Sequence, residues 1–89
     1  MTLSNLNDLI VKEMDYGRSR FGPYHNSHEH YAVLQEEVDE WWDAIKGNVS
    51  DCSMYELVQV AAVAMRYILE NNTLDLAKIQ DARHDSKSR

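Results

Sequence analysis

The sequence predicts an all-α protein, a small bundle of three to four helices. Apolar residues recur at helical spacing through most of the chain, and no stretch shows the apolar–polar alternation of a strand. The 89 residues include three Gly and one Pro, and 44% of them are hydrophobic, which is typical of a compact helical protein. Such a short chain buries only about 60–65% of its extended surface, so we expect homo-oligomerisation to complete its core.

A first helix is predicted within residues 1–20. Ser4 or Asn5 is placed to cap its start, and Gly22-Pro23 is placed to end it. Its apolar positions follow helical spacing and are Leu6, Leu9, Ile10 and Met14.

The element around which the chain is organised is a second helix over residues 27–46. Asn26 or Ser27 caps it, Asn26 forms a capping-box-like pair with Glu29, and Gly47 is its expected C′ residue. At about 100° per residue, the apolar side chains of this helix gather into one stripe about its central leucine. The stripe consists of Tyr31, Leu34, Val38, Trp41 and Ile45.

Five acidic residues on the same helix divide into two groups. Glu36, Asp39 and Asp43 lie opposite the stripe, where water solvates them, whereas Glu37 and Glu40 lie along its edge. Two carboxylates at i and i+3 repel one another unless a positive charge lies between them, and Mg²⁺ prefers oxygen ligands. A solvated acidic face is the simpler interpretation, so a second acidic element is needed to favour a metal.

That second element lies on a third helix, predicted over residues 54–70. The helix is apolar on nearly every side, so we expect it to be the central, most buried one. Its polar exceptions, Glu56, Gln59 and Arg66, share one face. Helices joined by a short loop pack antiparallel, so Glu56 and Gln59 could face the edge carboxylates and enclose a metal. Alternatively, Glu56 only completes a capping box with Ser53.

A short fourth helix is predicted between Thr73, as its cap, and about Arg83. Residues 84–89 are predicted to be a frayed tail, which leaves 1–83 as a single domain without a linker. The apolar side of this helix consists of Leu74, Ile79 and Ala82.

The composition narrows the choice of partners and location. A net charge of −6 argues against a nucleic-acid backbone as partner but permits a small nucleotide whose charge a metal bridges. Cys52 is the only cysteine, so no intrachain disulfide can form. No apolar run approaches the roughly 20 residues of a membrane span, and no signal-peptide pattern is present. The expected location is the cytoplasm, or the host cytoplasm for a viral protein.

The acidic pairs and their surroundings resemble one known family. Glu36-Glu37-x-x-Glu40, followed after residues 41–55 by Glu56-x-x-Gln59, is similar to the motif E-E-x-x-E…E-x-x-D of the MazG-type all-α nucleoside triphosphate pyrophosphohydrolases. The flanking text, F-G-P-Y-H before the motif and V-A-A-x-A-x-R after it, resembles a small phage and bacterial branch.

The resemblance implies Mg²⁺-dependent cleavage of a nucleoside triphosphate to the monophosphate and pyrophosphate, with Mn²⁺ as a substitute. By position, Glu37, Glu40, Glu56 and Gln59 would hold the metal, and Glu36 would complete the four catalytic carboxylates. The outward angle of Glu36 argues against direct ligation. A homodimer or a dimer of dimers is also implied, with a role in nucleotide-pool cleaning or viral nucleotide metabolism.

Gln59 departs from the motif, which has Asp at this position. A neutral amide oxygen can coordinate Mg²⁺, but it adds no charge and is a poor general base. One alternative is therefore a nucleotide-binding module that has lost turnover. A purely structural dimerisation bundle is a third hypothesis, which the second acidic pair argues against because such a bundle does not need it.

Four more side chains are candidates for binding substrate. Arg66 could contact a phosphate or form an ion pair with Glu37 or Glu40. His28 and His30 could line a nucleotide pocket, although surface histidines are commonly inert. Trp42 could stack on a base, although it is more simply explained as part of the core or a subunit interface.

Overall fold

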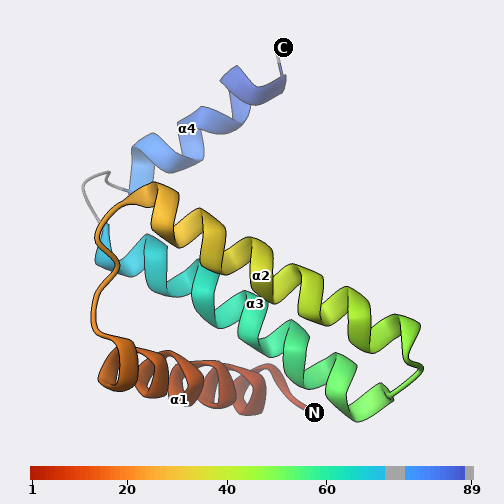
Figure 1. Ribbon diagram of the computed structural model, residues 1–89. Helices are drawn as coiled ribbons and strands as arrows, with labels where there is room; N and C mark the ends of the chain where they lie inside the picture. Colours follow the sequence, from red (N-terminus) through yellow and green to blue (C-terminus); the bar gives the residue numbers. More distant parts are fainter. Residues whose placement is uncertain (72–75, 88–89) are drawn as a thin grey trace.

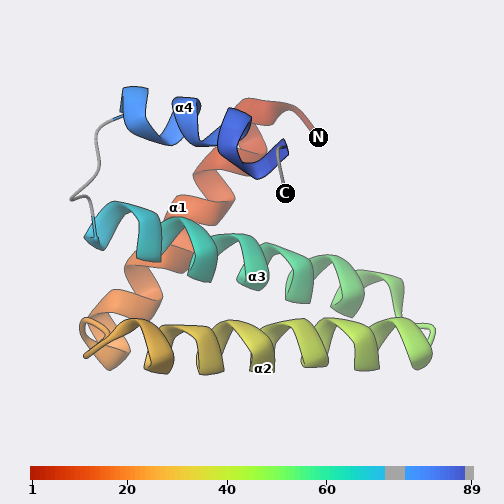
Figure 2. The same cartoon turned by 90° about the horizontal axis from the view of Figure 1, so that it is seen from above.

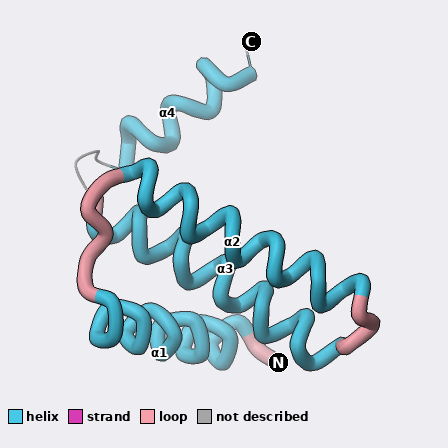
Figure 3. The backbone as a smooth tube through the Cα atoms, in the orientation of Figure 1, coloured by secondary structure: helices cyan, strands magenta, loops and turns pink. Residues whose placement is uncertain are grey.

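The computed structural model describes residues 1–71 and 76–87, with 83–87 described by their backbone alone. The described part contains the helices α1 (Leu3–Phe21), α2 (Ser27–Lys46), α3 (Ser50–Glu70) and α4 (Leu76–Lys87). Figure 3 shows loops between the helices and no strand in these ranges. The predicted all-α bundle is therefore confirmed.

The helix α3 is the central element, as predicted. It lies antiparallel beside α2 (Figure 1), and α1 crosses it obliquely (Figure 2). Among the described residues, only the pairs α2–α3 and α1–α3 bring helix backbones within 8 Å between Cα atoms. The helix α4 extends away from this three-helix unit. None of the described helices has the length and apolarity needed to cross a membrane.

The N-cap of α1 lies two residues before Ser4, the first of the two predicted caps. Thr2 is the N-cap, and its hydroxyl accepts a hydrogen bond from the Asn5 backbone N–H at 3.1 Å. The Asn5 side-chain oxygen accepts in return from the Thr2 backbone N–H at 3.3 Å. Asn5 thus belongs to the capping box without being the cap residue, and Ser4 lies within the first turn. Gly22, at φ 72°, ends the helix as predicted.

The connection from α2 to α3 differs from the prediction at both ends. Gly47 has an ordinary helical φ of −76°, and Asn48 instead takes the left-handed conformation at φ 59°. Asparagine tolerates this conformation better than other residues with a side chain. The chain reverses so tightly that α3 already begins at Ser50, with Val49 as its N-cap. The predicted capping box of Ser53 and Glu56 is therefore wrong, and the Glu56 carboxylate is left for other contacts.

The start of α2 agrees with the prediction in part, and the end of α4 lies beyond the predicted one. Asn26 caps α2 as predicted, but Glu29 turns its carboxylate to His25 rather than to Asn26, so only half of the capping box forms. The helix α4 runs to Lys87, past the end predicted near Arg83, because no Gly or Pro interrupts it. Thr73, Leu74 and residues 88–89 lie outside the described ranges.

The core is small for the amount of apolar surface available. Ile10, Met14 and Ala62 are buried where α1 crosses α3, with Val58 and Met65 packed around them. The predicted stripe of α2 is only half-buried in its middle, at Leu34, Val38 and Trp41, and its ends are 68% exposed at Tyr31 and 41% at Ile45. Further apolar side chains of α3 are exposed and include Met54, Tyr55, Leu57, Ile68 and Leu69.

Candidate functional site

Three carboxylates from two helices meet on one side of the α2–α3 pair. One oxygen each of Glu37, Glu40 and Glu56 lies within 4.8 Å of the other two. Antiparallel packing of α2 and α3 places Glu56, near the start of α3, opposite the second half of α2. The structure thus brings together three of the four predicted metal ligands.

Crowding and burial change the acidity of this carboxylate cluster. Burial raises the pKa of Glu37 to about 7, and repulsion from Glu40, Glu56 and Glu36 adds to this effect. Burial and the neighbouring Glu40 also raise the pKa of Glu56. A positive charge placed among the three carboxylates would therefore stabilise them at neutral pH.

The donor set fits a hard divalent cation. It consists of carboxylate oxygens, which Mg²⁺ prefers, and two ligands on opposite sides of one Mg²⁺ lie about 4.2 Å apart. That separation is close to the 4.8 Å within which the three oxygens lie. The buried Oε2 atom of Glu37 has no hydrogen-bond partner among the described residues. Small side-chain rotations would bring the three oxygens around one ion.

Gln59, the fourth predicted ligand, has a different partner. Its Nε2 donates a hydrogen bond of 2.7 Å to Oε2 of Glu13 on α1. Gln59 therefore links α3 to α1 and is not one of the three clustered oxygens. Sequence reasoning missed Glu13, although a glutamate between the buried Ile10 and Met14 on a helix is itself a signal of a partly buried carboxylate.

A pocket of about 120 Å³ lies next to the carboxylate cluster, between α1, α2 and α3. Glu13, Glu37 and Gln59 line it together with Arg66. The aromatic side chains that line it are Tyr16, Phe21, Tyr24 and Tyr55.

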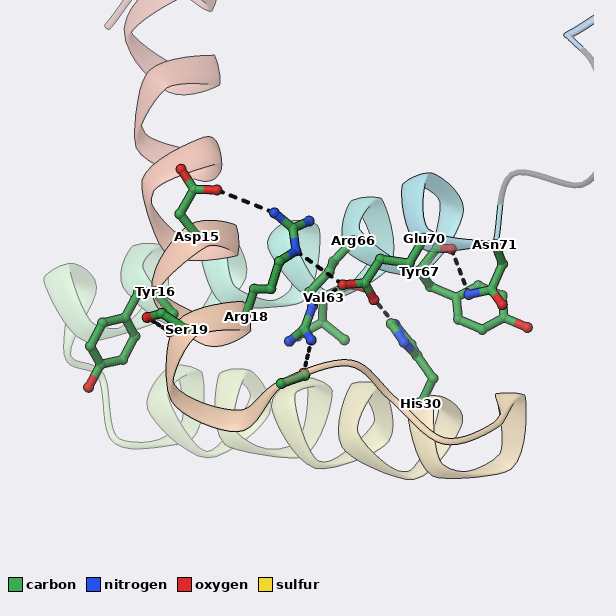
Figure 4. Close-up of polar contacts among 11 residues, drawn as sticks. Asp15, Tyr16, Arg18, Ser19, His30, Val63, Arg66, Tyr67, Glu70 and Asn71 are labelled. Atoms are coloured by element: carbon green, nitrogen blue, oxygen red, sulfur yellow. Dashed lines mark hydrogen bonds and ion pairs between the residues drawn. The ribbon is translucent and has the colours of Figure 1, made fainter.

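Arg66 is buried and does not pair with Glu37 or Glu40. Its Nε donates to Oε1 of Glu70 at 2.8 Å, its Nη2 donates to the Gly22 carbonyl, and its guanidinium lies 4.5 Å from the centre of the Tyr24 ring. Figure 4 shows the contacts of Arg66 with Glu70 and with the α1–α2 connection. The ion pair predicted for Arg66 thus exists, but with an acid of its own helix one turn away.

Burial raises the pKa of the Tyr55 hydroxyl, and the nearby carboxylates of Glu13, Glu56 and Glu37 raise it further. The carboxylates that raise the pKa of Tyr55 thus come from all three helices, α1, α2 and α3. The hydroxyl stays protonated at neutral pH and remains a hydrogen-bond donor beside the carboxylates.

The two histidine candidates lie away from the pocket. His30 is buried between the rings of Tyr24 and Tyr67, and its Nε2 lies 2.6 Å from the Val63 carbonyl, to which it donates. Burial lowers the pKa of His30, so its ring is neutral. His28 is exposed at the start of α2. Neither residue lines the pocket that contains Glu37.

The remaining two candidates lie on the outer surface of α2. Trp42 is 55% exposed, and the Lys46 ammonium lies 5.7 Å from the centre of its ring. Glu36 is exposed, as its helical angle predicted, and it acts on the site only by repelling Glu37. The stacking of Trp42 on a base stays a prediction.

No family model, curated protein or solved structure matches this chain. The resemblance to the MazG-type enzymes therefore rests on the acidic motif and its flanks.

Proposed function

We propose that this protein is a Mg²⁺-dependent nucleoside triphosphate pyrophosphohydrolase that releases a nucleoside monophosphate and pyrophosphate, with Mn²⁺ as a substitute metal. The carboxylate cluster of Glu37, Glu40 and Glu56 is the observation that carries this proposal. Three acids this close together repel one another unless a cation joins them, and their positions coincide with the acidic motif. A divalent ion held there would neutralise phosphate charge and the charge that develops during cleavage.

Each residue of the proposed site would have a separate role. Glu37, Glu40 and Glu56 would hold the ion, and the Tyr55 hydroxyl beside them would donate a hydrogen bond to a phosphate oxygen. Arg66 would shape the pocket, because its Nε and Nη2 donors are already bonded within the protein. Binding in a partly enclosed pocket would keep the scissile phosphate oriented towards the attacking water.

A nucleotide-binding protein without turnover is the second candidate. The observation that favours it is that position 59 is a neutral glutamine, whose amide donates to Glu13, so the cluster among the described residues has three carboxylates and not four. If four charges were required for hydrolysis, the pocket would bind a metal–nucleotide complex and leave it intact.

We further propose that the protein acts as a homodimer or a dimer of dimers in the cytoplasm, or in the host cytoplasm if it is viral. The exposed apolar side chains on α1 and α3, Leu9, Met54 and Leu57 among them, support association of copies. The net charge of −6 argues against nucleic acid as a partner.

The deciding experiment is a panel of ribo- and deoxyribonucleoside triphosphates with Mg²⁺, assayed for pyrophosphate release. Wild-type protein should hydrolyse at least one of them, and Glu40→Gln should abolish release. Asp43→Asn is the matched control, because Asp43 is an exposed acid on the same helix that pairs only with Lys46. Tight triphosphate binding without pyrophosphate would favour the second candidate, and neither binding nor release would contradict both.

A further inference from the structure

The hydrogen bond between Gln59 and Glu13 joins residues 46 positions apart in the sequence, on two different helices. We propose that Glu13 is a positioning residue that fixes the Gln59 amide, so that its carbonyl oxygen serves as the neutral fourth oxygen of the metal site. This inference rests on the proposed function, and it adds α1 to a site that the motif places on α2 and α3 alone.

The chemistry of the amide supports this role. A glutamine side chain ends in one acceptor oxygen and one donor nitrogen, and rotation about its last bond exchanges them. The Glu13 carboxylate can only accept, so it holds the Nε2 end at 2.7 Å. The Oε1 end is then the one left to face a cation. Without Glu13, the N–H₂ group could turn towards the cation and repel it.

Two observations place this pair beside the carboxylate cluster. Glu13 and Gln59 line the same pocket as Glu37. Gln59 follows Glu56 by three residues on α3, so the two side chains leave neighbouring positions of one helix face.

The pair also accounts for the departure from the motif. An aspartate at position 59 would bring a second anion towards Glu13 and would have no donor to offer it. A glutamine supplies that donor, so the two residues form a matched donor and acceptor between α3 and α1.

The test measures Mn²⁺ affinity by calorimetry, with no nucleotide present, on the wild type and on five variants. Glu13→Ala removes the acceptor, whereas Glu13→Gln keeps an acceptor oxygen and loses the charge. Gln59→Ala and the double variant with Glu13→Ala complete a thermodynamic cycle. Asp8→Asn is the matched control, an exposed acid on α1 that does not line the pocket. Circular dichroism melts establish that each variant is folded.

We expect Glu13→Ala to weaken Mn²⁺ binding by about tenfold or more, the usual effect of removing a group that orients a metal ligand. Glu13→Gln should retain most of the affinity, and Asp8→Asn should retain all of it. In the Gln59→Ala background, Glu13→Ala should have no further effect.

Two results would overturn the positioning role. One is an equal loss in Glu13→Gln and Glu13→Ala, which would mean that only charge matters. The other is a Glu13→Ala effect that persists without Gln59. Both leave the proposed function intact, provided that wild-type binding is lost in Glu40→Gln. If the wild type binds no Mn²⁺, the proposed function and this inference both fail.

Discussion

The Nε atom of Arg66 lies 2.8 Å from Oε1 of Glu70, and Arg18 reaches the same oxygen from α1 at 3.2 Å. The Arg66 side chain is 4% exposed, whereas that of Arg18 is 45% exposed. One carboxylate of α3 thus anchors a buried cation of its own helix and a solvated cation of another. A substitution should be felt more at Arg66 than at Arg18, because the buried Arg66 guanidinium also donates to the Gly22 carbonyl and lies against the Tyr24 ring.

We expect Arg66→Met to lower the free energy of unfolding by about 3 kcal/mol, since it leaves Glu70 and the Gly22 carbonyl without their buried donor. Arg18→Met, which removes the exposed partner of the same carboxylate, should cost less than about 1 kcal/mol. Urea unfolding at neutral pH measures both. If the two substitutions cost the same, Arg66 is not a structural anchor, and phosphate binding becomes the better interpretation.

The stability that Arg66 supplies should also depend on pH. Burial alone would raise the pKa of Glu70, but hydrogen bonds from Arg66 and Arg18 outweigh it and lower the pKa below 4.5. A lowered carboxyl pKa stabilises the fold above the unfolded-state pKa, and this stabilisation is lost as the pH falls through the folded-state pKa. The difference between wild type and Arg66→Met should therefore narrow in acid. A constant difference would contradict the ion pair.

Glu37 should show the opposite dependence. Its pKa is raised from 4.5 to about 7, so the folded state favours the protonated form. Without divalent metal, wild-type stability should fall as the pH rises from about 4.5 to about 7. Glu37→Gln resembles the protonated acid, and we expect it to stabilise the protein by about 1–2 kcal/mol at about pH 8, a value reduced for solvent screening.

Urea unfolding in the presence of a chelator measures this effect for Glu37→Gln at two pH values. The stabilisation should become small at about pH 5 and vanish below about pH 4, where both states bind the proton. Glu36→Gln is the control, because Glu36 is exposed and contributes only a minor part of the repulsion. Destabilisation by Glu37→Gln at the higher pH would mean that the charged carboxylate has a favourable partner.

Gln59→Asp distinguishes the enzyme from the nucleotide-binding protein. The substitution breaks the hydrogen bond to Glu13 and adds a carboxylate, so we expect about 1–3 kcal/mol less stability without metal. With saturating Mg²⁺, an active wild type should change its rate only modestly, because in the proposed site three carboxylates would already hold the ion. An inactive wild type that gains hydrolysis would show that position 59 had removed turnover. Gln59→Asn, which shortens the side chain without adding charge, separates the two effects on stability.

Light scattering should give a mass of two or four times the 10.3 kDa chain across micromolar concentrations. The reason is the apolar surface that the three-helix unit leaves exposed, including Leu9, Met54 and Leu57 along one groove. Leu57→Lys, which places a charge in that groove, should shift the protein towards a monomer, whereas Lys12→Gln on the neighbouring polar surface should not. A mass near that of one chain for the wild type would exclude the predicted oligomer.

Helical periodicity and local signals determined much of this protein from its sequence. The bounds of α2, its Asn26 cap, the end of α1 at Gly22 and the central place of α3 all follow from side chains within a few residues of one another. The grouping of Glu37, Glu40 and Glu56 also followed, because the i, i+3 spacing and one tight connection leave few ways to arrange two helices.

Only the tertiary structure decided which partner each polar side chain found. Gln59 pairs with Glu13 and Arg66 reaches the Gly22 carbonyl because α1 crosses α3 at those positions, and a crossing point is not encoded in helical periodicity. The early start of α3 likewise depended on the left-handed conformation of Asn48. Hydrophobic patterns specify which face of a helix is buried, whereas long-range polar contacts depend on how far each helix slides and turns along its neighbour.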